Sequence, residues 1–285
     1  MENMNPEQIF GSFMPWKLDE STWILNFMNG SQNVYLLEGK ERALLIDTGW
    51  GAASLAETVK CLTDKPVVAA NTHYHPDHAD GNGYFTQVYV SRNWKDDAPG
   101  MDGSAMLPFD LQKMPHPDYE KIEVGEGDTI DLGDRMIEVL EVKNAHCNSS
   151  LFFLDRDHRM IFVGDEMEAA QVNLFDNSYN PELKYDVDER LRNFRANTVR
   201  LKELSPFYTY LLPNHNGFPI AVEYLDDYIE LVDEIYLGKA EIEDKLNHPF
   251  IEMDPQAKYL CRVRHKNASI FIRKDELLKV YGTQI

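Results

Sequence analysis

The residues PVVAANTHYHPDHADGNGY, numbers 66–84, contain the most informative pattern in this 285-residue chain. The apolar and β-branched residues 66–72 predict a buried strand that ends directly at His73. Three imidazoles and one carboxylate follow within six residues: His73, His75, Asp77 and His78. Zinc, iron and manganese accept such ligands. With nine histidines in the chain, chance yields HxHxDH in about one such sequence per thousand.

The spacing of this motif predicts two neighbouring metal positions. Side chains alternate along an extended chain, so His73 and His75 point to one side and can bind one ion. A turn at Pro76 redirects Asp77 and His78, which we expect to serve a second ion.

Three further candidate ligands follow predicted strands. His146 follows MIEVLEVKNA, Asp165 closes RMIFVGD, and His215 follows YTYLLPN. Because a sheet holds the end of each strand in place, a polar side chain there is a common component of a functional site.

The remaining patterns favour an α/β protein with sheets in the middle and helices outside. Apolar runs bounded by turn residues predict strands at 21–27, 33–39, 43–49, 136–142, 150–155, 159–165 and 208–214, and a hairpin at 259–264 and 269–274. Helical patterns occur at 52–62, 187–204 and 222–242, and the first twenty residues predict an irregular arm.

We expect one domain over residues 1–285, because the chain has no linker-like or low-complexity segment. Residues 92–120 lose periodicity but stay apolar, which is typical of a lid insertion or of a disordered excursion. Residues 222–285 are expected to form a helix plus β-hairpin extension.

The motif HYHPDH at 73–78, the later His146, Asp165 and His215, and the early LIDTG at 45–49 resemble the metallo-β-lactamase superfamily. The resemblance implies a four-layer αββα sandwich with metals at the edge between its two sheets. It assigns the first ion to His73, His75 and His146, and the second to Asp77, His78 and His215. Asp165 would bridge the two ions, and Asp47 would orient the ligand loop from behind.

Three features distinguish this chain within that family. The Asp at position 165 is similar to the residue that hydrolases of thioesters, lactones and phosphoesters carry there, whereas true β-lactamases generally carry Cys or Ser. His75 differs from the Glu of the diiron flavoproteins. The segment NAHCNSS around His146 lacks the usual Pro-Gly-Ser turn.

The resemblance implies a hydrolase of a small ester, lactone or thioester that acts by attack of a metal-bound hydroxide. We expect two divalent ions, zinc first and iron or manganese as alternatives, with Asp77 or Asp165 moving the proton. Candidates for assisting the leaving group are Tyr74, Tyr179, Tyr185 and Tyr208. The alternatives are a mononuclear iron-dependent, persulfide-type dioxygenase and a non-catalytic binding protein on the same fold.

Composition bears on partners and location. The net charge of −20 disfavours nucleic acid and favours a small-molecule substrate. Three widely spaced cysteines, no signal-like segment and no membrane-spanning run predict a cytoplasmic protein away from membranes. The acidic helix at 222–242 and the hairpin suggest a homodimer interface, although a solvated helix face explains them equally well.

Overall fold

The computed structural model of the chain describes residues 13–27, 32–97, 114–174, 186–244 and 259–284. Its largest sheet has seven strands in the order β1-β2-β3-β4-β5-β6-β7. Neighbours are antiparallel from β1 to β4 and parallel from β4 to β7. The strands are β1 (Phe13–Lys17), β2 (Thr22–Phe27), β3 (Gln32–Glu38), β4 (Ala43–Ile46), β5 (Val67–Ala70), β6 (Gln87–Ser91) and β7 (Glu120–Val124).

A second sheet has five strands in the order β13-β11-β10-β9-β8. Its neighbours are antiparallel except β11 and β13, which run parallel and therefore end at the same edge. The strands are β8 (Thr129–Asp131), β9 (Met136–Glu141), β10 (Leu151–Asp155), β11 (Met160–Gly164) and β13 (Tyr210–Pro213).

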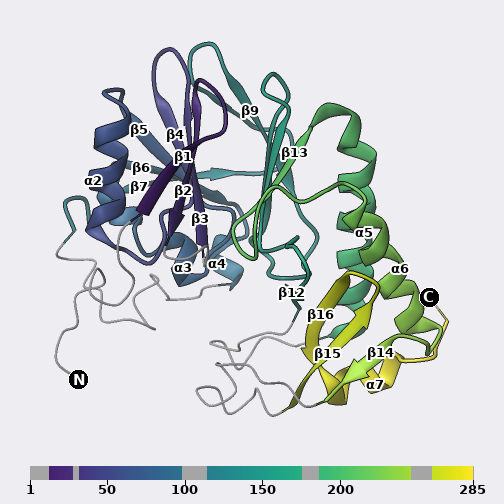
Figure 1. The fold of residues 1–285 in the computed structure, drawn as a ribbon. Coiled ribbons are helices and arrows are strands. Elements are labelled where there is room, and N and C mark those ends of the chain that lie inside the picture. Colours follow the sequence, from purple (N-terminus) through teal and green to yellow (C-terminus); the bar gives the residue numbers. More distant parts are fainter. Residues whose placement is uncertain (1–12, 28–31, 98–113, 175–185, 245–258, 285) are drawn as a thin grey trace.

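Helices cover the outer face of each sheet (Figure 1). The first sheet is covered by α2 (Ala53–Leu62), and the second by α5 (Val187–Leu204) and α6 (Tyr224–Tyr236). The short helices α3 (Pro76–Ala79) and α4 (Trp94–Asp97) lie below the sheets in that view. This arrangement confirms the predicted αββα sandwich.

Apolar packing explains the layers. Tyr35 and Phe162 meet between the two sheets, with ring centroids 5.0 Å apart. On the outer face of the second sheet, Phe152 of β10 packs in one core with Phe194 of α5. Strands β4, β10 and β11 are buried along their whole length, because both of their faces are covered. Their sequences are therefore continuous apolar runs.

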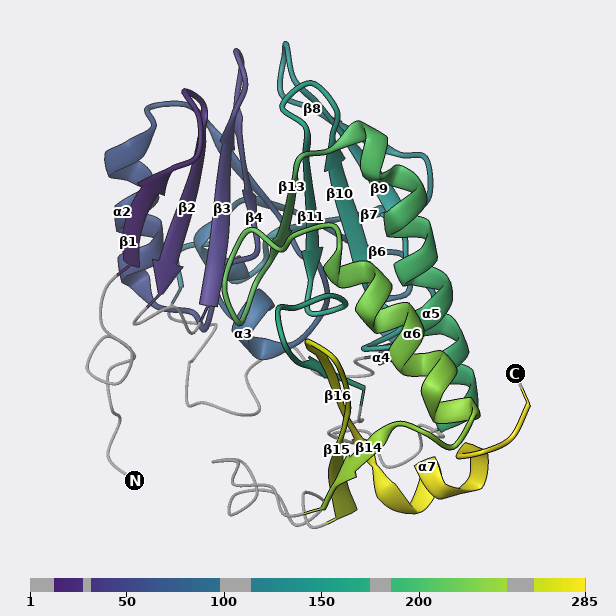
Figure 2. The same cartoon turned by 45° about the vertical axis from the view of Figure 1, so that its right-hand side comes forward.

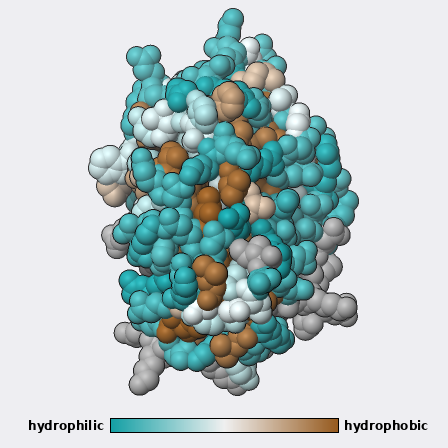
Figure 3. Space-filling view, turned by 90° about the vertical axis from the view of Figure 1, so that its right-hand side faces the viewer, coloured by the Kyte–Doolittle hydropathy of each residue, from teal (hydrophilic) through white to brown (hydrophobic). Residues whose placement is uncertain are grey.

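Figure 3 views the side of the molecule that α5 and α6 cover. Hydrophilic residues predominate on this face, and the hydrophobic residues form separate patches. Both helices turn their apolar residues inward, as the burial of Leu191 and Leu231 shows.

A third sheet lies beside the lower ends of α5 and α6 (Figure 2). Its strand order is β12-β16-β15-β14, and α7 (Lys274–Val280) follows it. The predicted hairpin is present as β15 (Leu260–His265) and β16 (Ala268–Arg273), to which β14 (Glu241–Glu243) and β12 (Val172–Asn173) add.

Several local predictions were wrong. The predicted arm contains strand β1, which pairs with β2 although Pro15 interrupts its pattern. The helix expected at 222–242 ends at Tyr236, and Gly238 with a φ of 68° breaks it before β14. A helix, α7, follows the hairpin in place of a short tail. Much of the predicted lid, residues 98–113, lies outside the described residues. Among the described residues, no helix is long and apolar enough to cross a membrane.

Candidate metal centre

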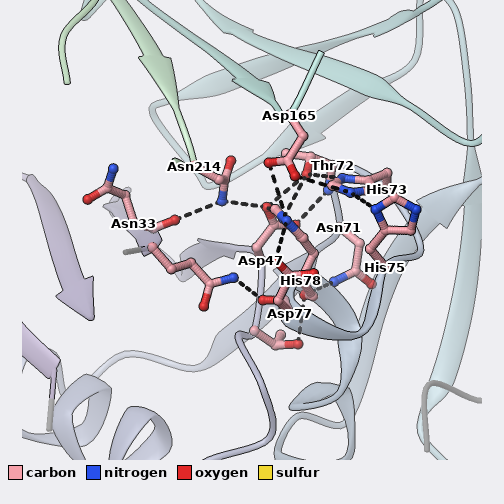
Figure 4. Close-up of polar contacts among 12 residues, drawn as sticks. Asn33, Asp47, Asn71, Thr72, His73, His75, Asp77, His78, Asp165 and Asn214 are labelled. Atoms are coloured by element: carbon pink, nitrogen blue, oxygen red, sulfur yellow. Dashed lines mark hydrogen bonds and ion pairs between the residues drawn. The ribbon is translucent and has the colours of Figure 1, made fainter. Parts of the chain in front are cut away.

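Loops that follow β5, β9, β11 and β13 meet at one edge of the two large sheets. The close-up in Figure 4 shows side chains from the loops after β5 and β11, among them His73, His78 and Asp165, pointing toward one another. The loop after β5 carries four of the predicted ligands, and the other three loops carry one each: His73, His75, Asp77, His78, His146, Asp165 and His215. All seven side chains converge, in two groups of potential ligand atoms.

The first group consists of His73, His75, His146 and Asp165. Nδ1 of His75 lies 2.9 Å from Nε2 of His73 and 3.1 Å from Nε2 of His146. Oδ2 of Asp165 lies 3.9 Å from the His73 nitrogen and 3.8 Å from the His146 nitrogen. Three imidazoles and one carboxylate oxygen therefore surround one point.

The second group consists of Asp77, His78, His215 and again Asp165. Oδ1 of Asp165 lies 3.3 Å from Nε2 of His78 and 3.4 Å from Nε2 of His215. Oδ2 of Asp77 lies 3.4 Å and 3.1 Å from the same two nitrogens. The two oxygens of Asp165 thus belong to different groups.

Both groups fit a bound cation. Ligand atoms at 2.0–2.1 Å from a tetrahedral zinc ion are separated by about 3.3 Å, close to the distances found here. Oδ1 of Asp165 is buried, and within the described part of the chain it has no hydrogen-bond partner. A buried carboxylate oxygen that faces two ring nitrogens is the environment expected of a metal ligand.

Asp47 lies directly behind the ligand loop (Figure 4). Its Oδ1 accepts from the backbone N–H of Thr72 at 2.7 Å, and its Oδ2 accepts from the Thr72 hydroxyl at 2.8 Å. Oδ2 also accepts from Nδ1 of His78 at 2.9 Å and from Nδ2 of Asn214 at 2.7 Å. One carboxylate therefore joins the loop after β5 to the loop after β13.

The two groups differ in electrostatics. Burial, with neighbouring histidines, lowers the pKa of His73, and burial lowers the pKa of His75 to about 3. Burial also acts to lower the pKa of His215, but the charges of Asp165 and Asp77 outweigh it and raise that pKa to about 10. The pKa of His78 is raised for the same reason. The histidines of the first group are therefore neutral at pH 7. The histidines of the second group are protonated, and their positive charge partly neutralises the carboxylates beside them.

Some of the ligands are accessible to solvent. His73, His78 and Asp165 are buried, whereas the side chains of Asp77 and His215 are 17% and 19% exposed. His75 of the first group is partly exposed as well, so solvent reaches ligands of both groups.

Two buried acidic residues near the centre were not predicted. Glu166 accepts from the backbone N–H of His146 at 3.1 Å, and burial raises the pKa of its carboxyl to about 7. Glu168 accepts from Nδ2 of Asn216, and burial raises its pKa to about 8. Three acidic residues just after a buried strand, in GDEMEAA, were the available signal.

The structure describes two of the four tyrosines that were candidates for assisting the leaving group, Tyr74 and Tyr208. The Tyr208 hydroxyl donates to the carbonyl of Leu201 at 2.8 Å and is buried, so it cannot assist a leaving group. The ring of Tyr74 lies 4.8 Å from that of His75, centroid to centroid. Tyr179 and Tyr185 lie outside the described residues. Cys147 is buried, with its Sγ 3.3 Å from the Ser150 hydroxyl.

Comparisons with known proteins agree with this geometry. The family model of the metallo-beta-lactamase superfamily matches residues 28–227. Among solved structures, a metallo-beta-lactamase from Pontibacter korlensis superposes with a TM-score of 0.55 at 19% identity, covering 78% of this chain and 99% of that one. At this identity the superposition supports the fold alone.

Curated relatives match part of the chain. Acyl-coenzyme A thioesterase MBLAC2 of Gallus gallus is 27% identical over 165 residues, 47% of this chain and 56% of that protein. Hydroxyacylglutathione hydrolase of Erythrobacter litoralis is 32% identical over 99 residues, 35% of this chain and 33% of that protein. The match to the thioesterase thus spans about half of that protein's length.

Proposed function

Because this chain belongs to the metallo-β-lactamase superfamily, we propose that it is a dinuclear metal-dependent hydrolase of small thioesters, lactones or esters, with thioesters first. The observation that carries the proposal is Asp165, whose Oδ2 faces His73 and His146 and whose Oδ1 faces His78 and His215. A carboxylate with one oxygen in each of two histidine groups is suited to hold two cations side by side.

Each group has a defined role in this proposal. His73, His75 and His146 would hold one ion, Asp77, His78 and His215 would hold the other, and Asp165 would contribute one oxygen to each group. Two bound divalent ions supply a Lewis acid and an activated water. Asp47 accepts the Nδ1 proton of His78, which leaves Nε2 of that ring free to bind.

Proton movement falls to Asp77. Its side chain is 17% exposed against 8% for Asp165, so its Oδ2 can pass a proton from the attacking water outward. In thioester hydrolysis the water oxygen bonds to the acyl carbon, the carbon–sulfur bond breaks, and the thiol leaves with one proton.

The names of the curated relatives support thioesters as the first class to test. One is an acyl-coenzyme A thioesterase and another is a hydroxyacylglutathione hydrolase. The chain has Asp at 165, in keeping with the hydrolase branches that the sequence resembles. We also propose a cytoplasmic location and a homodimer. The net charge of −20 supports a small-molecule substrate over nucleic acid.

The test combines elemental analysis with a substrate panel. Purified protein should contain about two zinc or manganese ions per chain and release free thiol from acyl-coenzyme A thioesters. His75→Ala should remove the activity, whereas His265→Ala, at a surface histidine paired with Glu230, should not. A single iron with oxygen consumption on a persulfide would establish the dioxygenase instead. Protein that binds no metal after reconstitution would exclude both enzymes.

A further inference from the structure

A row of side chains on α5 binds the backbone of the segment that carries His146. The row comprises Arg190, Asn193, Asn197 and Arg200, spaced by three, four and three residues, so all four lie on one helix face. Arg190 donates to the carbonyls of Ala145 at 2.7 Å and His146 at 2.9 Å.

The rest of the row continues this pattern along the segment. Asn193 donates to the carbonyl of Asn144 at 2.8 Å, and Asn197 donates to that of Lys143 at 2.8 Å. Asn197 also accepts from the backbone N–H of Lys143 at 3.1 Å. Arg200 donates to the carbonyl of Glu141 at 2.8 Å, outside the loop. Side chains of a rigid helix thus bind consecutive carbonyls of a loop that lacks the Pro-Gly-Ser turn of its family.

The imidazole of His146 is held from another direction. Its Nδ1 lies 2.8 Å from the carbonyl oxygen of Asn173, to which it donates, and Nε2 is left for the metal group. Asn173 belongs to β12, which pairs in parallel with β16 of the C-terminal sheet. The Ser269 hydroxyl donates to the carbonyl of Ala170 at 2.6 Å, and Leu174 N–H donates to that of Phe271 at 2.9 Å.

We propose that Arg190, Asn193 and Asn197 of the α5 row, which bind the loop around His146, and the C-terminal sheet are positioning elements of the metal centre that act together on His146. The inference rests on the proposed metal binding. Residues 222–285 are then an integral part of one metallo-β-lactamase-like domain, not an appendage. Because coupling between two processes is reciprocal, metal binding at His146 must also stabilise the C-terminal sheet.

The first test uses two pairs of matched variants and zinc titration against a competing chelator. Arg190→Leu removes the bonds to Ala145 and His146; Arg200→Leu removes the bond of the same row to Glu141. Ile270→Ala perturbs β16 beside β12, and Ile24→Ala makes the same fully buried change in β2. Arg190→Leu and Ile270→Ala should weaken zinc binding at one of the two sites, raising its dissociation constant about 10- to 100-fold. The two controls should leave both constants unchanged.

The second test compares backbone amide exchange of the folded wild-type protein with and without zinc. Zinc should slow backbone amide exchange in β12, β15 and β16 as well as in the ligand loops. In His146→Ala that protection of the C-terminal sheet should disappear, whereas in His215→Ala it should persist.

The outcomes separate this inference from the proposed function. Wild-type protein that binds no metal overturns the proposed function. The wild-type protein can instead bind two ions while the test and control variants change zinc affinity equally, or while zinc gives the C-terminal sheet no protection. Either result overturns the positioning role alone.

Discussion

Nδ1 of His78 lies 2.9 Å from Oδ2 of Asp47, and both side chains are fully buried. The two residues are 31 positions apart and come from loops that follow β4 and β5. The bond orients the ring so that Nε2 points to the second ligand group. Asp47 has a φ of 65°, a conformation that Asp and Asn adopt more readily than most residues.

Asp47→Asn should selectively weaken binding of the second ion, at the group that contains His78. Asparagine tolerates the backbone but offers one acceptor oxygen where the carboxylate receives four donors. We expect metal affinity at the His78 group to fall about 10- to 100-fold. Elemental analysis after dialysis should give one ion per chain. Retention of two ions at wild-type affinity would show that Asp47 does not orient the loop.

Metal binding should release protons from the second group only. The pKa of His215 is raised to about 10, so the ring is protonated at pH 7 and must lose its proton to bind a cation. His75, with a pKa lowered to about 3, has none to lose. Calorimetry in buffers of different ionisation enthalpy should show about one to two protons released for one ion and none for the other. Affinity of the proton-coupled ion should rise with pH between 6 and 9.

The same shift predicts how the metal-free fold depends on pH. A raised folded pKa stabilises the protein below the unfolded value of 6.5, and this contribution is lost as pH rises through about 10. Thermal unfolding of metal-free protein should therefore show a lower Tm at pH 10.5 than at pH 7. His215→Ala should reduce this pH dependence, and an unchanged profile would contradict the assignment.

Gly164→Ala should disturb the contact between the two halves of the site. Gly164 precedes Asp165 with a φ of 58°, and a Cβ there would lie 2.7 Å from the Thr72 hydroxyl oxygen. We expect a loss of more than about 1–2 kcal/mol in unfolding free energy, because a clash adds to the backbone strain, together with weaker metal binding. Gly127→Ala is the control, since its φ of 82° imposes the strain but nothing lies within 4 Å.

Arg135→Met should destabilise the fold without changing the metal content. Arg135 and Asp155 are 1% and 0% exposed and form an ion pair with a nitrogen–oxygen distance of 2.6 Å. Removing one partner of a buried pair costs about 3–5 kcal/mol. Urea denaturation should show this loss, whereas Arg156→Met, at a pair with Glu138 that is about a third exposed, should cost less than about 1 kcal/mol.

Local pattern was enough to predict the layered fold and the residues that converge. The helix at 187–204 was predicted with the bounds of α5, because a charged amphipathic run with Asp186 before it carries its own start signal. Strand β1 and helix α7 were missed. Pro15 hides the pairing of β1 with β2, and α7 is too short for a clear period.

The ligand types and their order along the chain could be read from the motif, since HxHxDH and strand ends are local features. The division of Asp165 between two histidine groups was expected from the family resemblance and not from the motif, and neither predicted the bonds from Arg190 and Asn173 to His146. These contacts join residues between 19 positions apart, as His146 and Asp165, and 92 positions apart, as His73 and Asp165. Their geometry depends on how two sheets, α5 and the C-terminal sheet pack together, and no periodicity in the chain encodes that packing.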